Sequence, residues 1–98
     1  MKIFSHQELK AMVRPLLQKY NAVDALLFGS YARNEATVDS DIDLVIVGGA
    51  DFRPIDVFAL AEDLHERSGK AVDVYALQEL NAGSPIYRSV MTEGVSLQ

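Results

Sequence analysis

The sequence predicts one small α/β domain of the α+β type, in which a mixed β-sheet is flanked by helices. The chain has 98 residues, of which 49% are apolar and none is Cys, so it can build one hydrophobic core and is too short for two domains. Short apolar runs that end in glycine alternate with amphipathic stretches of helical period. Only one link between these runs has room for a full crossover helix, which predicts both parallel and antiparallel strand pairs.

The first helix is predicted to begin after Ser5 and to reach about Tyr20. Ser5 and Glu8 have the spacing of a capping box, and apolar residues then recur at helical spacing. Pro15 falls inside this pattern. Because proline lacks a backbone N–H and crowds the preceding turn, we expect the helix to kink or to restart there.

Three short apolar runs predict the strands. Residues 23–28 are closed by Gly29, residues 43–47 are closed by Gly48, and residues 71–77 form the third run. Their lengths and their glycine boundaries are typical of buried strands.

Two further helices have clear boundary signals. The second begins at Pro54, a favourable first-turn residue, and ends at Gly69, a favourable C′ residue. The third opens with Ser84 as N-cap and Pro85 at N1, and it stops near Gly94.

The links between the strands predict how they lie in the sheet. The segment 48–70 is long enough for a right-handed crossover, so the second and third strands should be parallel. The twelve-residue link 29–40 favours an antiparallel pair of the first and second strands. The end of the first strand and the beginnings of the other two then lie at one edge of the sheet.

Carboxylates and a Gly-Ser pair converge on this edge. Asp41 and Asp43 are two residues apart, so a strand directs both to one face, where they repel unless a divalent cation lies between them. Asp73, at the start of the third strand, can complete a second metal position. Oxygen ligands indicate Mg²⁺, or Mn²⁺ as the alternative, and Mg²⁺ is typically held by one or two carboxylates plus substrate phosphates. The edge therefore suits a nucleotide–metal complex.

A phosphate can lie at the end of the first strand. Gly29 has no Cβ to obstruct it, and the turn that begins at Ser30 offers backbone donors and a hydroxyl. Arg33 either adds a positive charge for a polyphosphate or forms a surface ion pair, and the sequence favours neither.

Charge and hydropathy exclude several classes of protein. A net charge of −5 argues against direct binding of the nucleic-acid phosphate backbone. No run of eighteen apolar residues occurs, so we expect no membrane segment. The missing cysteines fit a reducing compartment, and we expect a cytoplasmic protein.

These residues resemble the signature of the polymerase-β-like nucleotidyltransferases, and within them the minimal nucleotidyltransferases. The resemblance covers residues 1–98 as a single nucleotidyltransferase domain. It is carried by four segments. The first is Gly29-Ser30-Tyr31-Ala32-Arg33, and the second, which follows the Gly-Ser pair after ten residues, is Asp41-Ile42-Asp43-Leu44 with Ser40 before it. The other two are Val72-Asp73-Val74 and Glu93-Gly94-Val95. One departure is Asn34-Glu35-Ala36, where many relatives have a glycine.

The resemblance implies the fold of that superfamily and a role for each matching residue. It gives Asp41, Asp43 and Asp73 as catalytic residues that hold two Mg²⁺ ions. It gives Gly29 and Ser30 as phosphate-binding residues, and we place Arg33 and Ser40 with them as candidate nucleotide-binding residues.

The resemblance also implies an activity and a partner. The chain is expected to transfer AMP from ATP to a hydroxyl, that of a tyrosine, on a cognate ribonuclease toxin of the helical HEPN family, and so to act as its antitoxin. The apolar Val95 and Leu97 in the tail are compatible with a partner surface, and hence with a homo- or hetero-oligomer. Two alternatives remain: an antitoxin that masks the toxin without catalysis, and a nucleotidyltransferase for a small hydroxylated molecule.

Overall fold

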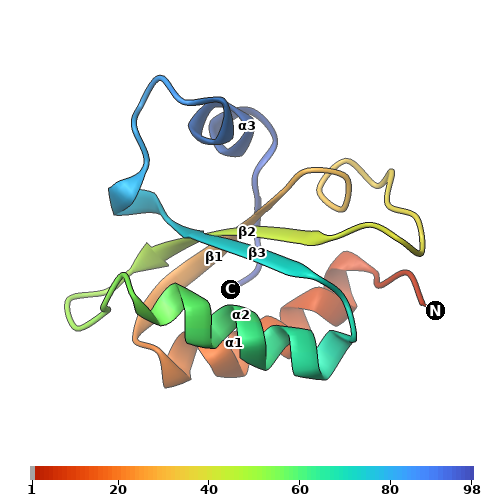
Figure 1. Ribbon diagram of the computed structural model, residues 1–98, viewed down its shortest axis with the longest axis horizontal. Coiled ribbons are helices and arrows are strands. Elements are labelled where there is room, and N and C mark those ends of the chain that lie inside the picture. The colour runs from red at the N-terminus through yellow and green to blue at the C-terminus, as the bar shows by residue number, and fades with distance from the viewer. Residues whose placement is uncertain (1) are drawn as a thin grey trace.

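A four-stranded mixed sheet separates two helices on one face from a third helix on the other (Figure 1). The computed structural model describes residues 2–98. The elements run in the order α1 (His6–Lys19), β1 (Ala22–Phe28), β2 (Ile42–Gly48), α2 (Asp56–Ser68), β3 (Val72–Ala76), the 3₁₀ turn η1 (Leu77–Glu79), α3 (Pro85–Glu93) and β4 (Val95–Ser96). The predicted fold class is confirmed.

Helix α1 begins at the predicted capping box. The Ser5 hydroxyl accepts a hydrogen bond from the Glu8 amide at 3.1 Å, and the Glu8 carboxylate accepts one from the Ser5 amide at 2.9 Å. The helix then runs as one element through Pro15, so the expected restart is wrong. Pro15 lies on the exposed side of α1, where water can bond the carbonyl group that has lost its N–H partner.

The other two helices end or begin at the residues that the sequence singled out. Gly69 caps α2 in the left-handed conformation with a φ of +72°. Helix α2 itself begins at Asp56, because Pro54 lies in the turn that precedes it. Ser84 caps α3 by accepting a hydrogen bond from the Tyr87 amide, and a proline follows it at the first helical turn.

The strand directions agree with the prediction. The order in the sheet is β3-β2-β1-β4, with β1 antiparallel to β2 and β2 parallel to β3. Phe28 at the end of β1 pairs with Asp43 of β2, and Asp43 in turn pairs with Asp73 of β3. The register therefore sets the two carboxylate-bearing residues side by side next to the end of β1.

The short strand β4 was not predicted, and it corrects the interpretation of the tail. Val95 pairs with Leu27 of β1. Leu97 is 0% exposed in the main core, and Val95 packs against the same core. The expectation that these two residues form a partner surface is wrong, because antiparallel pairing with β1 turns them into the chain's own interior.

A buried carboxylate holds this tail in place. Asp24 of β1 is only 8% exposed. It accepts hydrogen bonds from the Ser96 hydroxyl at 2.7 Å, the Gln98 amide at 3.1 Å and the Ala25 amide at 2.7 Å. Since each carboxylate oxygen has a donor, the burial of this charge is compensated.

The two faces of the sheet are packed unequally. Ile42 and Leu44 of β2 face α1 and α2 and belong to the main core. The alternate residues Asp43 and Val45 face the other side, where α3 covers a small cluster of Phe28, Val45 and Val90. Strand alternation thus directs Asp43 away from the main core, onto the face that α3 covers only in part. Within residues 2–98, no helix combines the length and hydrophobicity that a membrane span requires.

Replacing the buried carboxylate tests its role in the fold. We expect Asp24→Ala to lower the free energy of unfolding by about 2–4 kcal/mol, because three hydrogen bonds and the anchoring of β4 are lost. Urea denaturation followed by circular dichroism measures the change. Asp51→Ala, at an exposed position in a loop, is the control. A loss no larger than that of the control would show that Asp24 does not hold the tail.

Candidate functional site

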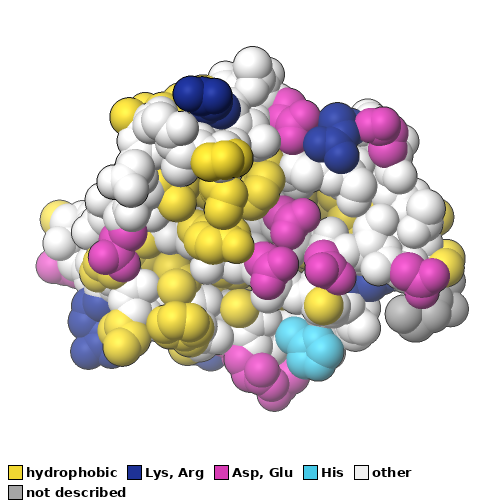
Figure 2. Space-filling view, turned by 45° about the horizontal axis from the view of Figure 1, so that its top comes forward, with side chains coloured by type: hydrophobic (Ala, Val, Ile, Leu, Met, Phe, Trp, Pro, Cys, Tyr) yellow, Lys and Arg dark blue, Asp and Glu magenta, His cyan; other side chains and the backbone are white. Residues whose placement is uncertain are grey.

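Three aspartates lie at one edge of the sheet, on the side of α3. Asp43 and Asp73 are register partners in the parallel pair β2–β3, and Asp41 directly precedes β2. Figure 2 shows acidic side chains gathered in the middle of this face, next to a hydrophobic patch. The predicted convergence of the three strand ends is therefore present in the structure.

The electrostatics of the site centre on Asp43. The pKa of its carboxyl group is raised from 3.8 to about 6, first by its half-buried position and then by the negative charges of Asp73 and Asp41. The charge of Arg33 acts in the opposite direction and is the weakest of these influences. Because the ionised form of Asp43 is disfavoured by its surroundings, a cation that neutralises the cluster would be stabilising.

Gly29 lets the end of β1 approach this carboxylate. Its φ is +75°, and a Cβ at this position would lie 2.5 Å from Oδ2 of Asp43. A side chain would therefore meet both backbone strain and a clash. The chain then forms a single helical turn, in which the Arg33 amide bonds the Gly29 carbonyl at 3.2 Å and the Glu35 amide bonds the Ser30 carbonyl at 2.9 Å.

The structure shows Arg33 in an ion-pair network. Its Nε lies 2.9 Å from Oε1 of Glu35, and its Nη1 lies 3.0 Å from Oε1 of Glu93. Of the two interpretations of Arg33, this arrangement corresponds to the ion pair. Ser40 uses its hydroxyl to accept a hydrogen bond from the Thr37 amide at 2.8 Å, so it stabilises the turn that leads into Asp41.

Glu93 is the site residue that sequence reasoning missed. It comes from the last turn of α3, and its Oε1 accepts hydrogen bonds from the Gly29 amide at 3.3 Å and from Arg33 at 3.0 Å. The Glu93-Gly94 pair is part of the family resemblance, which assigns Glu93 no role. The sequence signal for Glu93 is the glycine after it. Gly94 ends the helix and Val95 begins a strand beside β1, which places Glu93 opposite the end of β1.

The donor set fits a hard divalent cation. It consists of carboxylate oxygens on one face of two neighbouring strands, with no sulfur or imidazole among the three residues. In the part of the chain that the structure describes, no three His, Cys, Asp or Glu side chains are grouped closely enough to hold a metal ion on their own. Mg²⁺ does not require such a cage, because one or two carboxylates with water and phosphate oxygens complete its shell.

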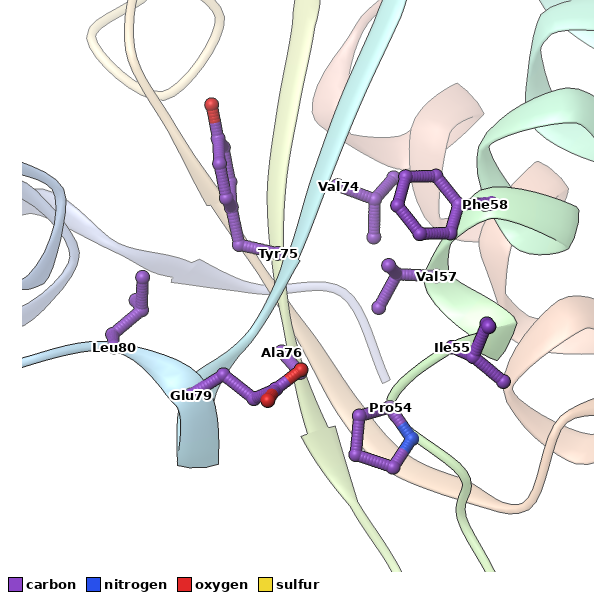
Figure 3. A pocket seen from close by; sticks show the side chains of 9 residues that line it. All are labelled: Pro54, Ile55, Val57, Phe58, Val74, Tyr75, Ala76, Glu79 and Leu80. Carbon is purple, nitrogen blue, oxygen red and sulfur yellow. The ribbon is translucent and has the colours of Figure 1, made fainter.

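An apolar pocket lies beyond Asp73, along the outer edge of β3 (Figure 3). Val74, Tyr75 and Leu80 line it from β3 and the following turn, and Ile55 and Phe58 line it from the beginning of α2. Ile55 is 67% exposed and Phe58 is 74% exposed, although both are large and apolar. Edge position and exposed apolar side chains together are typical of a surface that contacts another molecule.

The aromatic side chains near the site have different environments. Tyr31 is 2% exposed and belongs to the main core, as expected for a structural aromatic. Tyr75 is partly exposed, and its ring centroid lies 6.3 Å from that of Phe28.

Comparison with protein families identifies the class of this chain. Residues 12–98 match the family described as polymerase beta, nucleotidyltransferase. This match includes the Gly-Ser turn, the three aspartates and the C-terminal glutamate. The chain therefore belongs to the polymerase beta nucleotidyltransferase family and is a nucleotidyltransferase.

Similar proteins come from an archaeon. Two proteins of Methanocaldococcus jannaschii carry the name "Putative protein adenylyltransferase". One is 38% identical over 74 residues, which are 76% of this chain and 80% of that protein. The other is 48% identical over 46 residues, which are 45% of this chain and 46% of that protein.

Solved structures share the fold. A structure described as a "minimal nucleotidyltransferase" has a TM-score of 0.74 and 27% identity and covers 97% of this chain and 98% of its own. A toxin–antitoxin crystallised with AMP-PNP has a TM-score of 0.77 and 24% identity, over 91% of this chain and 72% of that chain. A tri-AMPylated HEPN toxin of Shewanella oneidensis in complex with an MNT antitoxin has a TM-score of 0.70 and 24% identity, over 94% and 71%.

The raised pKa of Asp43 predicts a pH-dependent gain in stability on its replacement. Between about pH 4 and pH 6 the folded state holds a proton on Asp43 that the unfolded state has lost, so the contribution of this group to stability falls as the pH rises through this range. We expect Asp43→Asn, in EDTA, to raise the free energy of unfolding at pH 7.5 by about 1–2 kcal/mol, after allowing for solvent screening of a half-exposed group. Near pH 4 the gain should vanish.

Urea denaturation at both pH values measures this difference. Asp51→Asn, in an exposed loop, is the matched control and should behave like the wild type at each pH. If Asp43→Asn is destabilised at pH 7.5, or changes stability equally at both pH values, the ionised Asp43 carboxylate does not lower the free energy of unfolding.

Proposed function

We propose that this nucleotidyltransferase transfers AMP from ATP to a tyrosine hydroxyl of a cognate HEPN-family toxin and thereby acts as its antitoxin. The observation that carries the proposal is the pairing of Asp43 with Asp73 in register, with Asp41 alongside and Gly29 in contact with the Asp43 carboxylate. Three carboxylates beside a glycine turn that could receive phosphates suit a metal-bound triphosphate.

The roles follow from the positions of the residues. Asp41 and Asp43 would hold Mg²⁺, and with Asp73 as a further ligand the site would hold two ions. Mn²⁺ could replace Mg²⁺, because it binds the same oxygen ligands. When bound, the ions would polarise the phosphates and lower the pKa of the attacking hydroxyl. Gly29 and Ser30 would receive the phosphates of ATP at the end of β1.

The reaction is a single in-line displacement at phosphorus. The tyrosine oxygen forms a bond to the α-phosphorus of ATP, and the bond from that phosphorus to the bridging oxygen breaks as pyrophosphate leaves. Asp73, exposed on the edge strand, would hold the metal beside the attacking hydroxyl or accept its proton. Arg33 would neutralise the triphosphate once released from its carboxylate partners, and Ser40 would contact the nucleotide from the turn before Asp41.

The acceptor hydroxyl would come from a second protein. The similar complexes of a toxin with an MNT antitoxin support a partner of this kind. The exposed Ile55 and Phe58, at the pocket along β3, offer it a docking surface that continues from Asp73. A net charge of −5 supports recognition of protein rather than of nucleic acid. We place the whole activity in one cytoplasmic domain, residues 1–98.

Replacing the metal-binding carboxylates tests the enzyme directly. We expect Asp41→Asn and Asp43→Asn each to reduce transfer at least about 100-fold, because the charge that neutralises the metal–triphosphate is lost. The measurement is intact-mass spectrometry of the partner encoded by the adjacent gene, after incubation with this chain, ATP and Mg²⁺. The wild type should add the mass of one or more AMP groups.

The matched control is Asp51→Asn, which should transfer AMP like the wild type, and circular dichroism should show that each variant is folded. Full transfer by Asp43→Asn would overturn the mechanism. If the double variant of Asp41 and Asp43 still protects cells from the toxin, the chain is an antitoxin that masks its partner without catalysis. Transfer to a small hydroxylated molecule without a partner would indicate the small-molecule enzyme.

A further inference from the structure

The last turn of α3 places a carboxylate on the groups proposed to bind phosphate. Oε1 of Glu93 accepts hydrogen bonds from the Gly29 amide at 3.3 Å and from Nη1 of Arg33 at 3.0 Å. The Glu93 side chain is 25% exposed, so it lies largely inside the site. A carboxylate and a phosphate are both anions that take charge-assisted hydrogen bonds from such donors. The same two donors cannot serve both at once.

The position of Glu93 is fixed by the fold on both sides. After it, Gly94 ends α3 with a hydrogen bond from its amide to the Val90 carbonyl at 2.9 Å, and a Cβ at Gly94 would clash with that carbonyl oxygen. The chain then continues directly into the pairing of Val95 with Leu27. Glu93 therefore lies between a capped helix and a paired strand, opposite the end of β1.

The charge around the turn opposes a second anion. The Asp43 carboxylate lies against Gly29, and Arg33 is shared between Glu35 and Glu93. A triphosphate that approaches Gly29 meets these carboxylates and an arginine whose charge is already paired. Because Glu93 accepts hydrogen bonds from both the Gly29 amide and Arg33, a phosphate that uses these two donors must displace its carboxylate.

We infer that Glu93 is an internal competitor that closes the phosphate-binding end of the site, and that nucleotide binding transfers the Gly29 amide and Arg33 from this carboxylate to phosphate oxygens. The inference rests on the proposed function, because it requires that ATP bind at Gly29. The closed contact lowers the apparent affinity for ATP by the fraction of molecules in which it is open. The site thus takes a metal-bound triphosphate when the Glu93 side chain releases these two donors.

Glu93→Gln isolates the charge of this side chain. Glutamine keeps the shape and one acceptor oxygen, but its neutral hydrogen bonds to Gly29 and Arg33 are weaker than those of a carboxylate. We expect the full chain carrying Glu93→Gln to bind ATP with Mg²⁺ about tenfold more tightly than the wild type, as measured by isothermal titration calorimetry.

Two variants are the controls. Glu35→Gln removes one partner of Arg33 without touching Gly29, so its gain should be smaller. Glu62→Gln, exposed on α2, should bind ATP like the wild type. In amide NMR spectra, the Gly29 resonance should shift on Glu93→Gln without ligand, and again when ATP and Mg²⁺ are added to the wild type.

The outcomes separate this inference from the function on which it rests. If the wild type binds ATP and Glu93→Gln binds it equally or more weakly, Glu93 is not a competitor, whereas the proposed function stands. If no variant binds ATP, both are overturned. If Glu93→Gln fails to fold, Glu93→Asp serves instead, because its shorter side chain withdraws the carboxylate from the donors and should also tighten ATP binding.

Discussion

The mutual repulsion of the carboxylates at one sheet edge is the constraint on which the rest of the site depends. Asp43 pairs in register with Asp73 and follows Asp41 by two residues, so the backbone fixes their proximity. Burial is the main cause of the raised pKa of Asp43, and the negative charges of Asp73 and Asp41 add to it. A fold that keeps like charges together has a lower free energy of unfolding. Such destabilising arrangements are common where a protein binds a cation and its anionic substrate.

The surrounding fold makes this arrangement tolerable. The main core lies on the opposite face of the sheet, so the charged edge interrupts no continuous apolar packing. Gly29 gives the Asp43 carboxylate room beside the backbone, and α3 covers the face only through a small cluster around Val90. The Asp43 carboxylate therefore lies on the less covered face of the sheet, beside the turn after β1. Glu93 occupies the Gly29 amide and Arg33, where the phosphates would lie.

Local signals account for most of the fold that could be predicted from the sequence. The capping box at Ser5, the left-handed Gly69 and the Ser84-Pro85 start of α3 all act within a few residues, and link lengths were enough for the strand directions. Strand β4 has only two residues, and its identity depends on pairing with β1, which is distant in the sequence. For the same reason the sequence does not reveal that Leu97 is buried.

The candidate site was likewise predictable only in part from the sequence. The proximity of Asp41, Asp43 and Asp73 follows from the strand directions and from the alternation of side chains along a strand, and the sequence predicts both. The partners of Arg33 do not follow from it, because Glu93 is sixty positions away and reaches the turn only through the end of α3. Side-chain contacts between distant elements require the packed structure.

The central claim is that a metal-bound nucleotide lies between the Gly29 turn and the three aspartates. Paramagnetic broadening of amide NMR signals by Mn²⁺ in the presence of ATP tests it most directly. The account predicts selective broadening at Gly29, Ser30, Asp41, Asp43 and Asp73, with the amides of α1 unaffected. Broadening centred on another surface, or spread evenly over the molecule, would contradict it.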